Sequence, residues 1–126
     1  MTPLEVVQDF VDRINAGDVQ GLAERMTEAH RFVDSLGAVR AGRGTLRRAW
    51  EQYFRRVPDY RVEVHEAFDR GAVVALFGAA RGTLARGGRL RAEDAWVTPA
   101  AWRAMIEGDL YADNEPIRRR MAARRE

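Results

Sequence analysis

The chain has 126 residues, of which 46% are hydrophobic and 32% are charged, and this is enough for one domain with a hydrophobic core. It has no cysteine, and all 21 basic residues are arginine, which excludes disulfides, thiol catalysis, cysteine-ligated metals, Schiff-base chemistry and a phosphate-loop lysine. The formal net charge is only +2, so composition does not indicate a strongly charged partner.

No apolar run approaches the roughly 20 residues that a membrane-spanning helix needs, and the first residues do not resemble a signal peptide. We therefore expect a cytoplasmic protein with no membrane partner. The arginine-rich residues 118–126 are predicted to be a basic C-terminal tail behind a single domain of residues 1–117. No aromatic residue interrupts this tail, so it has no platform for stacking bases, and nucleic acid is not the expected partner.

The N-terminal third predicts a helical hairpin. Thr2, Pro3 and Glu5 form a helix start with a capping box, and apolar residues then recur at helical spacing up to Gly17. Asp18 is expected to cap a short second helix that carries Leu22 and Met26 on one face.

Residues 29–40 predict a strand, a turn around 35–37 and a second strand. Thr45 is the expected cap of a third helix, which Pro58 ends. One face of this helix is an apolar stripe made of Leu46, Ala49, Trp50, Tyr53, Phe54 and Val57.

The remainder predicts antiparallel strands. Alternation predicts a strand over 60–65, and a continuous apolar run predicts a central strand over 72–84. Two further strands are expected over 90–98 and 102–106, separated by Pro99, and a last hairpin leads to a short strand over 110–112. Helices first and hairpins later favour an α+β fold, a cone-shaped curved antiparallel sheet wrapped around the N-terminal helices, whose apolar interior is suited to small molecules.

The order of elements, together with specific short segments, resembles the nuclear transport factor 2-like superfamily, in its branch of SnoaL-like polyketide cyclases and ketosteroid isomerase-related proteins. The resemblance covers about residues 2–117, and the segments that carry it are 14–18, 32–37, 43–44 followed by 50–54, 58–60, 99–104 and 111–116. It implies a deep pocket between the helices and the concave face of the sheet, and a homodimer through the sheet. It specifies no reaction, because this fold carries enzymes and binding modules alike.

Asp34 is the main catalytic candidate. It is flanked by Val33 and Leu36, and burial of such a carboxyl raises its pKa toward neutrality, as a general base requires. The resemblance implies the same role, since Asp34 matches the position of the aspartate base of ketosteroid isomerases. The alternative is a turn residue that accepts hydrogen bonds from nearby backbone amides.

The two oxyanion donors of ketosteroid isomerases are not matched. Their positions correspond by resemblance to Phe10 and to the neighbourhood of Ala101, neither of which has a polar side chain. Loss of one such donor typically costs on the order of 100-fold in rate, so true steroid isomerisation is not expected. The segment before Tyr111 is also several residues shorter than in relatives, which predicts a shortened last strand and an incomplete pocket wall or dimer sheet.

His30 and Tyr53 are the secondary catalytic candidates, as groups that could steady a developing oxyanion. His30 is placed on the strand of Asp34 and could instead be a structural histidine. Asp94 is expected to be a solvated carboxylate. Since the stripe of the third helix must face the sheet, it should line the pocket, and the predicted ligand-binding residues are Phe10, Trp50, Tyr53, Phe54 and Trp102.

Two histidines 35 positions apart without cysteine do not predict a metal site, and no cofactor motif is present. The sequence therefore predicts a protein that binds a small apolar or polyketide-like molecule. As an enzyme it would be a cofactor-independent isomerase or cyclase that abstracts a proton next to a carbonyl. The alternative is a non-catalytic ligand-binding or dimerisation module.

Overall fold

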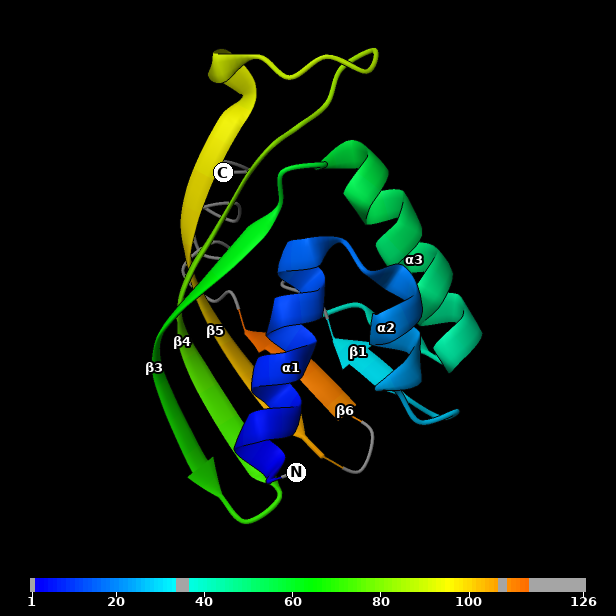
Figure 1. The fold of residues 1–126 in the computed structure, drawn as a ribbon, viewed down its shortest axis with the longest axis vertical. Helices are drawn as coiled ribbons and strands as arrows, with labels where there is room; N and C mark the ends of the chain where they lie inside the picture. The colour runs from blue at the N-terminus through cyan, green and yellow to red at the C-terminus, as the bar shows by residue number, and fades with distance from the viewer. Residues whose placement is uncertain (1, 34–36, 107–108, 114–126) are drawn as a thin grey trace.

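The computed structural model describes residues 2–33, 37–106 and 109–113, the last range as backbone only. Figure 1 shows a strongly curved sheet with helices on its concave side, the cone that the sequence predicts. The helices are α1 (Pro3–Ala16), α2 (Val19–Glu24) and α3 (Arg43–Arg56), and a short 3-10 helix covers Ala92–Asp94. The strands are β1 (Arg31–Val33), β2 (Val39–Ala41), β3 (Arg61–Arg70), β4 (Val73–Thr83), β5 (Ala95–Met105) and β6 (Asp109–Asp113).

The helical hairpin forms as predicted. Thr2 and Glu5 make the reciprocal capping box of α1, and Gly17 ends the helix with a φ of 65°, a left-handed conformation that glycine adopts without strain. The Asp18 side chain caps α2 by accepting from the backbone N–H of Gly21 at 2.9 Å. Arg13 of α1 donates to Asp18, the N-cap of α2, at 2.9 Å, and Arg25, the C-cap of α2, donates to Asp9 of α1 at 2.7 Å, so two ion pairs connect the helices.

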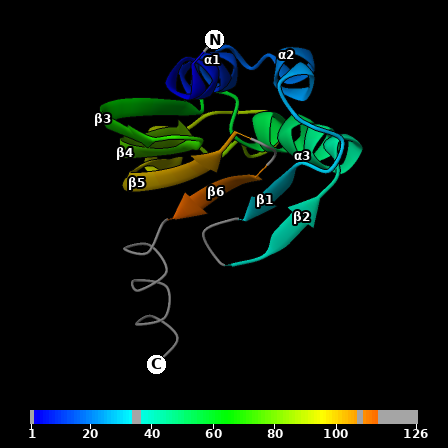
Figure 2. The ribbon, with the colours of Figure 1, turned by 90° about the horizontal axis from the view of Figure 1, so that it is seen from below.

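The sheet has six strands in the order β2-β1-β6-β5-β4-β3. Every neighbouring pair is antiparallel except β1 and β6, which are parallel, with Phe32 opposite Leu110. Strand β6 has five residues against eleven in β5, but it pairs with β5 on one side and with β1 on the other. The sheet is therefore continuous from β3 to β2 (Figure 2), although β6 is short, as expected, and among the described residues pairs with β5 only over Ala101–Met105.

Two predicted boundaries were wrong. Thr45 does not cap α3, because the helix begins at Arg43 and its N-cap is Gly42, whose φ of 98° few other residues adopt. The strands predicted over 90–98 and 102–106 are a single strand that runs through Pro99. Among the described residues, β6 pairs with β5 only from Ala101 onward, so no described strand pairs with this edge of β5 at Pro99, and a strand tolerates a residue without an N–H at such a position.

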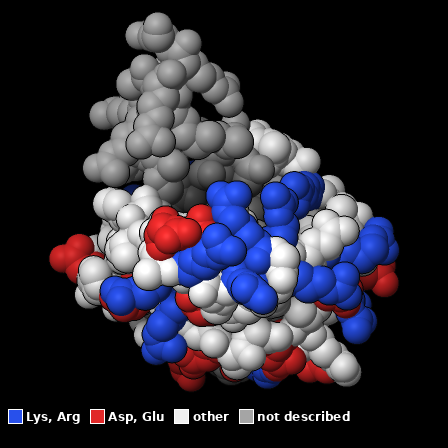
Figure 3. Space-filling view, turned by 90° about the horizontal axis from the view of Figure 1, so that it is seen from above, with Lys and Arg blue, Asp and Glu red and all other residues white. Residues whose placement is uncertain are grey.

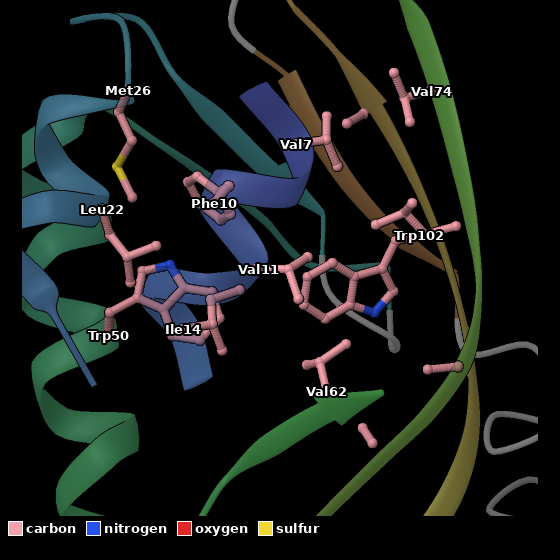
Figure 4. Close-up of a cluster of buried hydrophobic side chains, with 14 of the residues drawn as sticks. Val7, Phe10, Val11, Ile14, Leu22, Met26, Trp50, Val62, Val74 and Trp102 are labelled. Atoms are coloured by element: carbon pink, nitrogen blue, oxygen red, sulfur yellow. The ribbon is translucent and has the colours of Figure 1, made fainter. Parts of the chain in front are cut away.

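Helix α1 packs across β3 and β4, whereas α3 lies beside β1 and β2 and contacts α2. The core lies between α1, α3 and the concave face (Figure 4). In that view Trp102 extends from β5 toward Val11 of α1, and Trp50 extends from α3 toward Ile14. The concave face is built from alternate residues of the central strands, namely Val74, Leu76 and Ala80 of β4 and Ala100, Trp102 and Ala104 of β5.

Candidate functional site

A continuous series of aromatic side chains runs from β1 along α3 to the start of β5. Trp50 lies 6.1 Å from Phe32, 5.5 Å from Phe54 and 6.1 Å from Tyr53, measured between ring centroids. Tyr53 then meets Tyr60 at 4.9 Å with the rings perpendicular, and Tyr60 meets Trp96 at 6.0 Å. We call this set the aromatic series; its members are Phe32, Trp50, Tyr53, Phe54, Tyr60 and Trp96.

The helical spacing of α3 places the first part of the series, since residues 50, 53 and 54 share the face that carries buried Leu46. The turn after α3 places Tyr60. The backbone carbonyl of Arg56 accepts from the N–H of Ala85 at 2.7 Å, and the Asp59 carboxylate accepts from the N–H and hydroxyl of Thr83, each at 2.7 Å. The end of α3 is thereby fixed to the end of β4, and Tyr60 is held between Tyr53 and Trp96.

The two tyrosines give the series its polar groups. Burial raises the pKa of Tyr53 to about 12, against a smaller lowering effect of the Arg56 charge. Burial raises the pKa of Tyr60 further, and the neighbouring Tyr53 adds to this rise. Neither hydroxyl forms a hydrogen bond with the residues that the structure describes. Both groups are therefore neutral hydrogen-bond donors at physiological pH, in an environment formed mainly by rings.

Three of the predicted ligand-binding residues lie deep in the core. Phe10, Trp50 and Trp102 are only 6%, 7% and 6% exposed. Tyr53 is 37% exposed, and Phe54 is partly buried, so the series becomes more accessible toward the C-terminal end of α3. Residues of β3, β4 and β5, including Val62, Gly78 and Trp102, line a cavity of about 10 Å³, which is about the space that one water molecule occupies.

Asp34, the predicted base, lies outside the described residues. His30 is buried, 5% exposed, and its ring lies 6.2 Å from that of Phe10. The prediction placed His30 within a strand, but its N–H donates to the carbonyl of Thr27 in a turn, and β1 begins one residue later. His30 is thus held by the turn that connects α2 to β1, and its side chain packs against α1.

The sequence analysis missed Tyr60 as a site residue, because the alternation around it indicated only a half-buried strand. The contact with Tyr53 crosses from a helix to the turn that follows it, and no spacing rule predicts it. Asp94 was wrongly expected to be solvated: its side chain is only 12% exposed and accepts from Arg86 Nε at 3.0 Å.

Within residues 2–33 and 37–106, no three His, Asp or Glu side chains lie close enough together to hold a metal ion. Over the same described part of the chain, no helix has the length and apolar character required to cross a membrane.

Several solved structures share the fold. A protein of Shewanella denitrificans OS-217 assigned to the SnoaL-like polyketide cyclases matches with a TM-score of 0.79 at 10% identity, over 98% of this chain and 98% of its own. A protein of Catenulispora acidiphila DSM 44928 with a ketosteroid isomerase-like fold, in complex with trimethylamine, matches with a TM-score of 0.73 at 18% identity, over 89% and 85% of the two chains. TerC, co-crystallised with polyporic acid, matches with a TM-score of 0.73 at 11% identity, over 94% and 95%.

Among curated proteins, none matches this chain significantly. The family model of the SnoaL-like domain matches residues 7–108, which include most of α1, the whole of α2 and α3, and strands β1 to β5. Those residues contain the helical hairpin, the aromatic series and most of the sheet. The chain therefore belongs to the SnoaL-like domain family, with the cone-shaped fold of the nuclear transport factor 2-like superfamily.

Proposed function

We propose that this protein binds a small, largely apolar, cyclic or polyketide-like molecule between α3 and the concave face of the sheet. The observation that carries the proposal is the aromatic series, which combines flat apolar contact surfaces with two neutral hydroxyl donors that have no partner among the described residues. Such a combination orients a ring system that carries oxygen. Phe10, Trp50, Tyr53, Phe54 and Trp102 remain the proposed ligand-binding residues.

For the chemistry we propose proton abstraction next to a carbonyl, as in isomerisation or aldol-type cyclisation, without a cofactor. Asp34 would be the base, and Tyr53 or His30 would stabilise the oxyanion. SnoaL-like relatives assigned as polyketide cyclases support this choice of reaction class. A carboxylate in an apolar interior has the raised pKa that removal of a weakly acidic proton requires.

Hydrogen–deuterium exchange of 2-tetralone in D₂O tests the reaction. This bicyclic ketone has exchangeable protons next to its carbonyl, and NMR follows their loss. We expect the wild-type protein to accelerate exchange, Asp34→Asn to abolish the acceleration with an unchanged melting temperature, and Asp69→Asn, an exposed carboxylate at the end of β3, to behave as wild type. Acceleration that persists in folded Asp34→Asn would remove Asp34 from the mechanism.

A non-catalytic binding module is the second candidate. It is favoured because two positions that carry oxyanion donors in ketosteroid isomerases lack a polar side chain in this protein. By resemblance these positions correspond to Phe10, a buried core residue, and to the neighbourhood of Ala101. Native mass spectrometry of freshly purified protein, with analysis of the released small molecules, separates the two candidates when combined with the exchange assay. A retained molecule without any exchange activity would support the binding module.

We further propose a homodimer through the outer face of the sheet. This face exposes large apolar side chains, with Phe68 57%, Phe77 44%, Val97 64% and Met105 41% exposed, and Phe68 and Phe77 lie 6.1 Å apart. Contiguous exposed apolar surface is typical of an interface. We expect Phe77→Glu to shift the sedimentation coefficient to that of a monomer, whereas Val39→Glu, on the exposed strand β2, should leave the dimer intact. A monomeric wild type would contradict the proposal.

A further inference from the structure

One end of the aromatic series carries hydrogen-bond donors and a positive charge. Tyr53 and Tyr60 contact each other with perpendicular rings, and Arg56 follows Tyr53 by three positions on α3. Residues at this spacing are neighbours on a helix surface, so the guanidinium can lie beside the Tyr53 hydroxyl. In agreement with this geometry, the positive charge of Arg56 lowers the pKa of Tyr53, although burial has the larger, opposite effect.

The acidic side chains around these donors are bound to other groups. Both carboxylate oxygens of Asp59 accept from Thr83. The other acidic residues of these elements pair with arginines: Glu51 with Arg47, Glu93 with Arg91, and Asp94 with Arg86 through one carboxylate oxygen, whereas the second oxygen of Asp94 is buried and has no hydrogen-bond partner among the described residues. Arg56 itself forms no ion pair with the residues that the structure describes. Tyr53 and Tyr60 therefore offer two hydrogen-bond donors and Arg56 a positive charge, and none of these acidic side chains is bound to them.

The chain segments around Arg56 also carry a net positive charge. Segment 85–94 starts at the C-terminal end of α3, since the N–H of Ala85 donates to the carbonyl of Arg56. Segments 55–59 and 85–94 together contain five arginines and three acidic residues. Figure 3 looks onto this end of the molecule and shows arginine side chains gathered across it. A positive surface of this kind attracts anions toward the aromatic series.

We propose that Tyr53, Tyr60 and Arg56 bind an anionic oxygen of the ligand, a carboxylate or an acidic enol, at the end of the aromatic series. The aromatic rings bind the apolar body of the molecule, the two phenols donate to the oxygen, and the guanidinium neutralises its charge. This inference rests on the proposed ligand-binding function and deepens it, because it assigns the ligand to the acidic, ring-containing compounds and adds Tyr60 and Arg56 to the binding residues.

Isothermal titration calorimetry with 2-naphthoate and 2-naphthylmethanol at pH 7.5 tests the inference. The two compounds share the ring system, and only the first carries a negative charge. We expect wild-type protein to bind 2-naphthoate about 10-fold more tightly than the alcohol, because hydrogen bonds to charged groups contribute more than neutral ones. We expect both Tyr60→Phe and Tyr53→Phe to reduce affinity for naphthoate by roughly 10-fold and to weaken binding of the alcohol less, because a neutral acceptor loses a weaker hydrogen bond than an anionic one.

Arg56→Gln should also weaken binding of naphthoate more than binding of the alcohol. Its matched control is Arg55→Gln, because Arg55 is exposed one residue earlier and points to the opposite side of α3 from the apolar stripe. The tyrosine hydroxyls make no hydrogen bond with the described residues, so the phenylalanine variants should fold, and an unchanged melting temperature confirms this.

Equal affinity of the wild type for the two compounds, or an unchanged preference in folded Tyr60→Phe, would overturn the inference and leave the proposed apolar binding intact. Absence of binding by either compound would contradict the proposed function, and the inference with it.

Discussion

The side chain of Asn15 pairs with the backbone of Val62 as a neighbouring strand would. Asn15 Nδ2 donates to the carbonyl of Val62 at 2.9 Å, and Asn15 Oδ1 accepts from the N–H of Val62 at 2.7 Å. Val62 lies near the beginning of β3, which is an edge strand of the sheet, so no other described strand pairs with its outer side. The last turn of α1 is therefore attached to the sheet at the level of the aromatic series.

We expect Asn15→Ala to lower the free energy of unfolding by about 2 kcal/mol, because two partly buried backbone groups of Val62 lose their partners. Urea unfolding followed by circular dichroism measures this change. Gln8→Ala is the control, since Gln8 is an exposed residue of the same helix, and it should change stability by less than about 0.5 kcal/mol. Equal effects of the two substitutions would show that the Asn15 pair does not stabilise the fold.

The Asp59–Thr83 pair predicts an acid-sensitive contribution to stability. The hydroxyl of Thr83 donates to Asp59 and lowers the pKa of this carboxyl below its ordinary value of 3.8. The folded state then binds fewer protons than the unfolded state near that pH, so stability falls as the pH decreases through this range. We expect the wild type to lose more stability between pH 6 and pH 3 than Thr83→Val, which lacks the hydroxyl.

Urea midpoints at the two pH values measure this difference. Thr83→Ser keeps the hydroxyl and should retain the wild-type pH dependence. A Thr83→Val profile parallel to that of the wild type would contradict the assignment.

The buried pair of Tyr53 and Tyr60 predicts that stability also falls at high pH. Burial raises the pKa of Tyr53 to about 12 and also raises that of Tyr60. Because the folded-state pKa lies above the unfolded value of 10.0, the unfolded state loses its phenolic protons first. The free energy of unfolding is therefore unaffected well below pH 10 and decreases as the pH rises above it. We expect urea midpoints to fall between pH 9 and pH 11 in the wild type, and to fall less in the double variant Tyr53→Phe/Tyr60→Phe.

Absorbance at 295 nm provides a direct check, because phenolate absorbs there. At pH 11 the two tyrosines should still be protonated in the folded protein, so wild type and double variant should show nearly equal phenolate absorbance. A larger phenolate signal from the wild type at this pH would show that the tyrosines are exposed.

Two glycines should respond to alanine with opposite signs. A Cβ atom at Gly78 would overlap the backbone carbonyl oxygen of Glu63 on the paired strand, and neither strand can move without losing its register. We expect Gly78→Ala to destabilise the protein by about 3 kcal/mol. Gly44 lies in the first turn of α3, where an added Cβ would meet only the flexible end of the Arg48 side chain at 3.7 Å, an ordinary van der Waals contact, and Gly44→Ala should stabilise by about 0.5–1 kcal/mol. Thermal unfolding compares the two variants directly.

Local signals were sufficient for the helices and for most strands. The capping box of Thr2 and Glu5, the stop at Gly17 and the cap at Asp18 all act through neighbouring backbone groups, and each is confirmed. The prediction that Thr45 caps α3 was wrong because threonine also occurs inside the first turn of a helix. The φ of 98° that makes Gly42 the N-cap cannot be read from a sequence. Pro99 misled because a proline ends a strand only where its missing N–H would have had a partner.

The candidate site was only partly predictable. The apolar stripe of α3 identified Trp50, Tyr53 and Phe54 by their periodicity, because one face of a helix must be buried. Tyr60 could not be found in this way, since its contact with Tyr53 depends on how the chain turns after α3 and on the Asp59–Thr83 pair that holds this turn. Asp34 was identified by its apolar neighbours and by family resemblance, and its role remains a prediction.

The sequence by itself determined which segments are helical, which face of each helix is apolar, and that the fold is α+β, because these properties follow from short-range periodicity and capping. The cone shape was implied by the family resemblance. Only the tertiary structure decided which distant groups meet: Asn15 with Val62, Asp59 with Thr83, and Tyr53 with Tyr60 and Trp96. The physical reason is that such contacts depend on the curvature of the sheet and the placement of α3. Both arise from the packing of the whole core and cannot be read from any single segment.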